Sequence, residues 1–211
     1  MTITETDRET FQATVDDFQP QHHPDQCLPT ALKNILDEMA ERHGGTSPLS
    51  LSDLDDICEY ERGFASVTQN IHARLNPEIA ESGVEVKTAR GLNIEDLNAI
   101  INDQSRSLPV VELHQDYFDS IDDYDPRAGS NGYQWFHVVI PFAVNDETIL
   151  FYDPYSQILL KSSRIDTPPT ERKQRRFFEW WTSSSGRWTL WVERKDQQMI
   201  TSSRFEDESN E

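Results

Sequence analysis

The sequence contains very little cysteine. Only two of its 211 residues are cysteines, Cys27 and Cys58. This number is too small for the disulfide framework of a small secreted domain. One bridge between the two remains the alternative, but we expect both thiols to be reduced and the protein to be cytoplasmic.

The chain is also poor in positive charge. It carries 38 acidic residues against 19 Lys and Arg, a formal net charge of -19, and only five of the basic residues are lysines. Such a surface repels phosphates and anionic lipids, so nucleic acids and membranes are excluded as expected partners. Because the acids are scattered along the whole chain, we favour a halophilic surface over a single acidic interaction face.

Long apolar runs are missing as well. The chain has no stretch of about 18 apolar residues, which is the length that a membrane-spanning helix needs. The N-terminus, MTITETDRETFQATVDDF, has neither a basic n-region nor an apolar h-region, so no signal peptide is expected. Residues 1–17 are expected to be a flexible segment or a short helix, 18–196 one domain, and 197–211 a flexible acidic tail.

The first half of the chain has helical periodicity. Apolar residues recur every three or four positions from Leu28 to Met39, and Pro29 suits a first helical turn. Gly44 and Gly45 end this helix. SLSDLDDICEYE is expected to form a second helix, capped by Ser50 or Ser52, and FASVTQNIHARLNPEI is a candidate third.

The second half favours a sheet. Strands are predicted at GVEVKTAR, SLPVVELHQDYF, WFHVVIPFAV, TILFYDPY and GRWTLWVER. The NDE between WFHVVIPFAV and TILFYDPY predicts that these two strands form a hairpin. NIEDLNAIINDQ, capped by Asn93, and RRFFEWWTSS are predicted helices. Asp119–Gly132 is expected to be a surface loop. Helices followed by a largely antiparallel sheet make the fold class α+β.

Cys27 stands at the start of the first long helix. Unsatisfied N–H groups and the helix dipole favour a thiolate there, and a thiolate is nucleophilic. Such a nucleophile needs a base, usually histidine. His137 is the best of the six histidines because it lies in the strongest predicted strand. A buried, unreactive cysteine is the alternative interpretation for Cys27, and it is the preferred one for Cys58.

Asp153 is expected to face His137 across the hairpin, or to lie within one residue of that position, with Pro141 as a possible bulge. A carboxylate there can orient the imidazole so that its other nitrogen takes the thiol proton. Gln21, six residues before Cys27, could donate to an oxyanion together with the Cys27 backbone N–H.

A metal site at His22, His23, Asp25 and Cys27 and a calcium site at FDSIDDYDPRAG are weaker alternatives. We therefore expect no metal and no cofactor.

These motifs resemble the papain-like cysteine peptidases, and in particular the peptidase C39-like family. The family pattern Q-x4-D-C-G-P/A-x-A-L is similar to QHHPDQCLPTAL, its histidine strand to WFHVVIPFAV, and its Asp-Pro strand to TILFYDPY. The resemblance runs from about Gln19 to Glu193. It implies an N-terminal helical lobe packed on a C-terminal antiparallel sheet, with a cleft between them.

By this resemblance, Cys27 is the nucleophile, His137 the base, Asp153 the orienting acid and Gln21 the oxyanion donor. The expected substrate is a peptide or protein amide, including isopeptides. Leu28 replaces the usual glycine of the motif, and Pro141-Phe142 replaces the usual Gly-Tyr. Two other functions therefore stay open: a catalytically inactive peptide-binding module, and a thiol acyltransferase or deamidase on the same fold.

Overall fold

The computed structural model describes residues 3–23, 25–60, 70–120, 136–154 and 170–195. The helices are α1 (Glu5–Val15), α2 (Cys27–Arg42), α3 (Leu51–Ile57), α4 (Ile71–Glu78), α5 (Ile94–Ile101), the 3-10 helix η1 (Gln115–Ser120) and α7 (Gln174–Ser183). The strands are β1 (Val84–Ala89), β2 (Val110–His114), β3 (Phe136–Val144), β4 (Thr148–Tyr152), β5 (Thr170–Lys173) and β6 (Thr189–Arg194).

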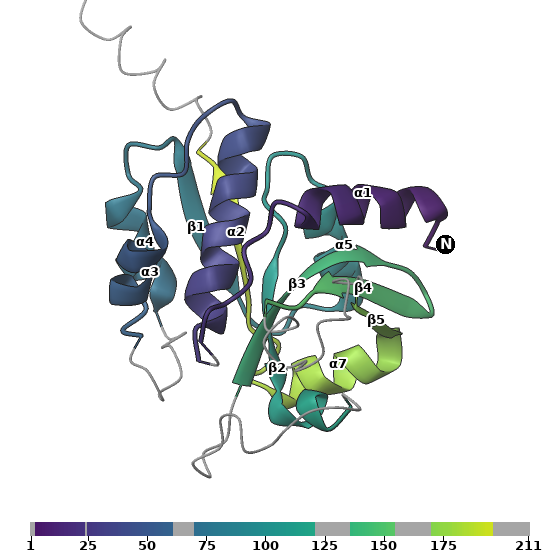
Figure 1. The fold of residues 1–211 in the computed structure, drawn as a ribbon. Coiled ribbons are helices and arrows are strands. Elements are labelled where there is room, and N and C mark those ends of the chain that lie inside the picture. Colours follow the sequence, from purple (N-terminus) through teal and green to yellow (C-terminus); the bar gives the residue numbers. More distant parts are fainter. Residues whose placement is uncertain (1–2, 24, 61–69, 121–135, 155–169, 196–211) are drawn as a thin grey trace, which may run out of the picture.

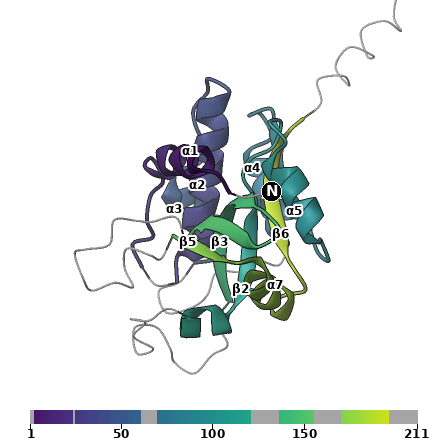
Figure 2. The ribbon, with the colours of Figure 1, turned by 90° about the vertical axis from the view of Figure 1, so that its right-hand side faces the viewer.

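The strands form one antiparallel sheet in the order β1-β6-β2-β3-β4-β5. Helices cover both of its faces (Figures 1 and 2). The larger core joins α1–α4 to one face and includes Leu32, Ile35 and Leu190. The smaller core joins α5, η1 and α7 to the other face and includes Phe151 and Trp181. The predicted α+β class is confirmed.

Local sequence signals explain where several helices begin. The side chains of Thr4, Ser50 and Asn93 each accept a hydrogen bond from the backbone N–H three residues later, and the acidic residue there bonds back to the cap. Such reciprocal caps satisfy two otherwise unpaired N–H groups. The predictions of Ser50 and Asn93 as caps are confirmed.

Two segments differ from the sequence-based prediction. The strand expected over SLPVVELHQDYF was too long, because β2 ends at His114 and Gln115 begins η1. Strand β5 was not predicted, since TERK has no apolar alternation. The candidate third helix is present as α4, which begins at Ile71. Part of that stretch, most of the Asp119–Gly132 loop and the acidic tail lie outside the described residues.

The N-terminal segment was expected to be either flexible or a short helix, and it forms the helix α1. In α1, Phe11 and Val15 are buried, and the Phe11 ring meets Phe142 edge-on with the centroids 4.9 Å apart. Arg8 pairs with Glu171 of β5 at 2.5 Å. These contacts place α1 against the end of β3 that is distant from His137 (Figure 1).

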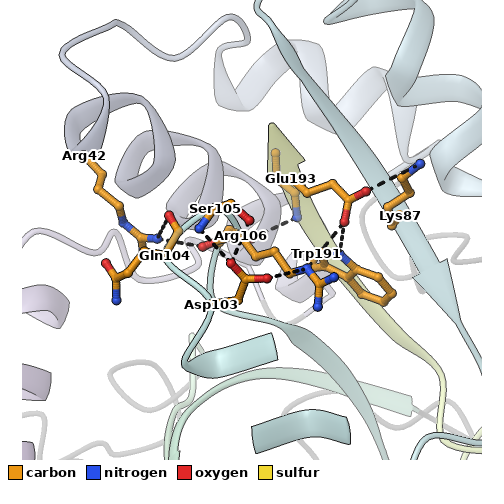
Figure 3. Close-up of polar contacts among 10 residues, drawn as sticks. Arg42, Lys87, Asp103, Gln104, Ser105, Arg106, Trp191 and Glu193 are labelled. Carbon is orange, nitrogen blue, oxygen red and sulfur yellow. Dashed lines mark hydrogen bonds and ion pairs between the residues drawn. The ribbon is translucent and has the colours of Figure 1, made fainter. Parts of the chain in front are cut away.

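The C-terminal end of α2 is tied to the sheet by a polar network (Figure 3). Arg42 donates to the carbonyl oxygens of Gln104, at 3.3 Å, and Arg106, at 2.6 Å. The Arg106 side chain in turn pairs with Asp103 and with Glu193 of β6, at 3.2 and 3.5 Å. The helix that carries Cys27 at its other end is thereby fixed against β6.

None of the helices among the described residues is long and apolar enough to cross a membrane.

Candidate active site

Cys27 is the first residue of α2. Its neighbour Gln26 holds the N-cap position without a capping side-chain bond. The Gln26 amide instead donates to both carboxylate oxygens of Asp55, at 3.0 and 2.9 Å, which fixes the helix start against α3. The Cys27 thiol is free and half-buried. A half-buried thiol at a helix N-terminus combines access for a substrate with a favourable position for negative charge.

His137 and Asp153 form a buried pair. The Nε2 atom of His137 lies 2.6 Å from Oδ1 of Asp153, and both side chains are 2% exposed. The expected facing register was wrong, because β3 pairs Ile140 with Tyr152, so the next residue, Asp153, falls opposite Val139. The register shift between Pro141 and Ala143 changes the residue opposite Asp153 only from Ile140 to Val139, so the position of the turn accounts for the rest of the difference. Asp153 therefore reaches His137 diagonally, a distance that polar side chains span.

The environment of His137 favours its charged form. Burial alone would lower the pKa of His137, but the charge and hydrogen bond of Asp153, with smaller contributions from Cys27, raise it to about 10. Because Asp153 engages Nε2, Nδ1 is the ring nitrogen that remains for a second partner. At neutral pH this arrangement favours an imidazolium.

Cys27 and His137 come together from positions 110 residues apart. The Cys27 side chain contributes to the raised pKa of His137, after Asp153, so it lies within interaction range of the imidazole. The start of α2 and the start of β3 lie at the same end of the molecule (Figure 1). A thiol beside an imidazole that is oriented by a carboxylate has the composition needed for nucleophilic catalysis.

Gln21 joins the same region through its backbone. Its N–H donates to the Pro154 carbonyl at 3.0 Å, next to Asp153. The Gln21 side chain is buried, and its amide Nε2 donates to the His23 carbonyl at 2.8 Å. That bond uses one of the two N–H donors of the amide. The oxyanion role expected of Gln21 remains a prediction.

Asn34 of α2 positions the segment that carries Gln21. Its Oδ1 accepts from the Gln19 N–H at 2.8 Å, and its Nδ2 donates to the Gln19 carbonyl at 3.0 Å. Asn34→Ala would leave both Gln19 groups without this partner inside the protein. We expect a loss of about 2–4 kcal/mol in the free energy of unfolding, measured in urea. A loss below about 0.5 kcal/mol would contradict this role.

Tyr117 and Phe118 are site residues that the sequence analysis missed. The Tyr117 hydroxyl donates to Oδ2 of Asp153 at 2.6 Å, and the ring centroid of Phe118 lies 5.0 Å from that of His137. Both residues belong to η1, in the stretch that was predicted to continue β2. Aromatic residues are common in strands, and no motif in the sequence distinguishes these two.

Comparisons with known proteins place this geometry in a structural context. No protein-family model and no curated protein sequence matches the chain. Among solved structures, it is similar to one described as a C39-like peptidase from Bacillus anthracis, with a TM-score of 0.53 and 13% sequence identity, over 86% of this chain and 96% of that one.

The chain has the fold of a C39-like peptidase domain. A further similar structure is the peptidase domain of Streptococcus ComA, a bifunctional ABC transporter involved in quorum sensing. It has 15% identity and a TM-score of 0.46, and the match covers 84% of this chain and 97% of that domain. The expected fold is confirmed, whereas the site residues and the cleft remain predictions.

Two residues depart from the family motif. Leu28 is 1% exposed and belongs to the larger core, against which Cys27 also packs. Pro141 lies at the register shift of β3, four residues beyond His137.

Cys58 is fully buried, and burial raises the pKa of its thiol to about 12, as expected for an unreactive cysteine. Among the described residues, no three His, Cys, Asp or Glu side chains cluster as metal ligands would. The stretch considered for calcium lies largely outside the described residues.

Proposed function

We propose that the protein is a cysteine peptidase that hydrolyses peptide or isopeptide amides. The proposal is supported chiefly by one observation: His137 is held by Asp153 at 2.6 Å and also interacts with Cys27. The thiolate sulfur attacks the amide carbon, which forms a tetrahedral oxyanion. The Cys27 N–H and the Gln21 amide are the proposed donors to this oxyanion.

The two halves of the reaction share His137. As the C–N bond breaks, the imidazolium gives its proton to the departing amine nitrogen, which leaves a thioester on Cys27. Neutral His137 then takes a proton from water, whose oxygen attacks the thioester carbon. The acid product leaves, the thiolate is restored and the imidazolium is reformed. No additional reactant is required.

A chromogenic peptide-ester probe tests the acyl-enzyme directly. We expect intact-protein mass spectrometry to detect an acyl adduct on Cys27, absent from Cys27→Ser. We expect Gln21→Ala to slow acylation by about 10²–10³, because one oxyanion donor is lost. Cys58→Ser is the matched control. No adduct at Cys27 under any condition would favour the inactive binding module.

The fate of the acyl group separates hydrolysis from transfer. The second candidate, a thiol acyltransferase, uses the same residues and differs only in the acceptor. We expect release of free acid even with a primary amine present, whereas predominant amide formation would favour the transferase.

We also propose that the acidic surface adapts the protein to high salt and that the protein works in a reducing compartment such as the cytoplasm, where Cys27 stays a thiol. A net charge of -19 repels itself at low ionic strength. The screening length falls from about 10 Å at 0.1 M to about 3 Å at 1 M salt. We expect the melting temperature to rise continuously over this range of KCl. A constant or falling melting temperature would contradict the salt adaptation.

A further inference from the structure

Asp153 has a described partner on each of its carboxylate oxygens. Oδ1 meets Nε2 of His137, and Oδ2 accepts from the Tyr117 hydroxyl, each at 2.6 Å. Hydrogen bonds to a charged group are shorter and stronger than neutral ones. With one donor on each oxygen, the carboxylate cannot rotate without breaking a bond. Tyr117 is therefore linked to His137 through the Asp153 carboxylate.

The Tyr117 ring is held on several sides. It is stacked parallel to the His137 ring, with an interplanar angle of 2° and the centroids 5.9 Å apart. Trp180 and Phe151 meet it edge-on at 5.4 and 5.9 Å. The residue is 1% exposed. Such packing leaves the hydroxyl little freedom to find another acceptor.

Charged and titratable groups from several elements interact with Asp153 and Tyr117. His137 interacts with Asp153 and with Cys27 of α2. Burial, and then the Asp153 charge, raise the pKa of Tyr117 well above its usual value, whereas Arg172 of β5 acts in the opposite direction. Burial and Asp153 also raise the pKa of Tyr152. The Tyr117 phenol therefore stays protonated and can only donate to Asp153 near neutral pH.

We propose that Tyr117 is a positioning residue that fixes Asp153 and limits the negative charge that Asp153 presents to His137. This inference rests on the proposed peptidase function. If Asp153 bonded to His137 alone, its full charge would hold the imidazolium proton more tightly. Such a histidine would be a poorer acid toward the departing amine. The second donor on Oδ2 keeps His137 oriented and still able to release its proton.

The test measures the charge of His137 through Cys27. Iodoacetate carries a negative charge that an imidazolium attracts, whereas iodoacetamide is neutral. The ratio of their rate constants at Cys27 should therefore fall as His137 loses its proton, with a wild-type midpoint at about pH 10. We expect Tyr117→Phe to move this midpoint upward by about half a unit to one unit. Replacing Tyr117 with 3,5-difluorotyrosine, a stronger donor of the same shape, should move it downward.

Control variants distinguish a positioning role of Tyr117 from a purely stabilising one. Tyr152→Phe also removes a phenol near Asp153, but that hydroxyl donates to the Gln19 carbonyl at 3.2 Å, so we expect an unmoved midpoint. In an Asp153→Ala background, Tyr117→Phe should have no effect on the midpoint, because coupled residues are non-additive. A midpoint unchanged in both Tyr117 variants, whatever their melting temperatures, would overturn the inference. In the wild-type protein the ratio should fall as the pH rises, and His137→Ala should abolish that fall. If the wild-type ratio did not fall, or if the fall persisted in His137→Ala, the peptidase proposal itself would fail.

Discussion

Iodoacetamide is expected to label Cys27 rapidly at pH 6, and His137→Ala is expected to slow that labelling by about 10²-fold. An ordinary thiol, with a pKa of about 8.5, is almost entirely protonated at pH 6. An adjacent imidazolium stabilises the thiolate and so maintains the reactive form at low pH. Peptide mapping after timed labelling gives the rate for each cysteine.

The chain provides two internal controls for the labelling experiment. Cys58 is buried, with its pKa raised to about 12, and should stay unlabelled in the folded protein. His43→Ala changes a histidine at the opposite end of the same helix and should leave the Cys27 rate unchanged. Labelling of Cys27 that begins only above about pH 8, with no effect of His137→Ala, would support the inactive binding module.

Asp153→Asn is expected to remove most of the pH dependence of stability between pH 6.5 and 10. The pKa of His137 is raised in the folded protein from 6.5 to about 10. A raised pKa contributes stability that is fully present below about pH 6.5 and is lost as the pH rises through about 10. The contribution is at most about 5 kcal/mol. Without the Asp153 charge, burial dominates and the pKa of His137 falls below 6.5.

Urea unfolding at pH 6, 8 and 10 measures this contribution. We expect the free energy of unfolding of the wild-type protein to fall over this range by more than that of Asp153→Asn. The comparison cancels the titrations of the lysines and of the tyrosines other than Tyr117 and Tyr152, whose pKa values Asp153 raises. Parallel pH dependences in the two proteins would mean that Asp153 does not hold the proton on His137.

Local signals in the sequence predicted most of the fold. The periodicity of α2, the cap residues Ser50 and Asn93, and the β-branched runs of β3 and β4 each encode their element within a few residues. The boundary at Gln115 could not be predicted, because QDYF fits a strand as well as a 3-10 turn. It is the burial of Tyr117 against Trp180 and Phe151 that accompanies the turn in the structure.

The residue types of the candidate site could be named from the sequence, but their geometry could not. Cys27, His137 and Asp153 each lie in a recognisable local setting, so the candidates could be named. Their pairing is diagonal, because the β3–β4 turn is centred later in the chain than a facing register would require and Asp153 falls opposite Val139. Tyr117 carries no local signal, because its role depends entirely on a contact with a residue 36 positions away.

The most direct test of the account is the protonation state of the His137 ring in the unmodified protein at pH 8. Nitrogen-15 NMR of labelled histidine distinguishes an imidazolium, with both ring nitrogens protonated, from a neutral ring with only one. We predict an imidazolium that persists to about pH 10 and is lost in Asp153→Asn. A neutral ring at pH 8 that titrates at or below 6.5 would contradict the proposed arrangement of Cys27, His137 and Asp153.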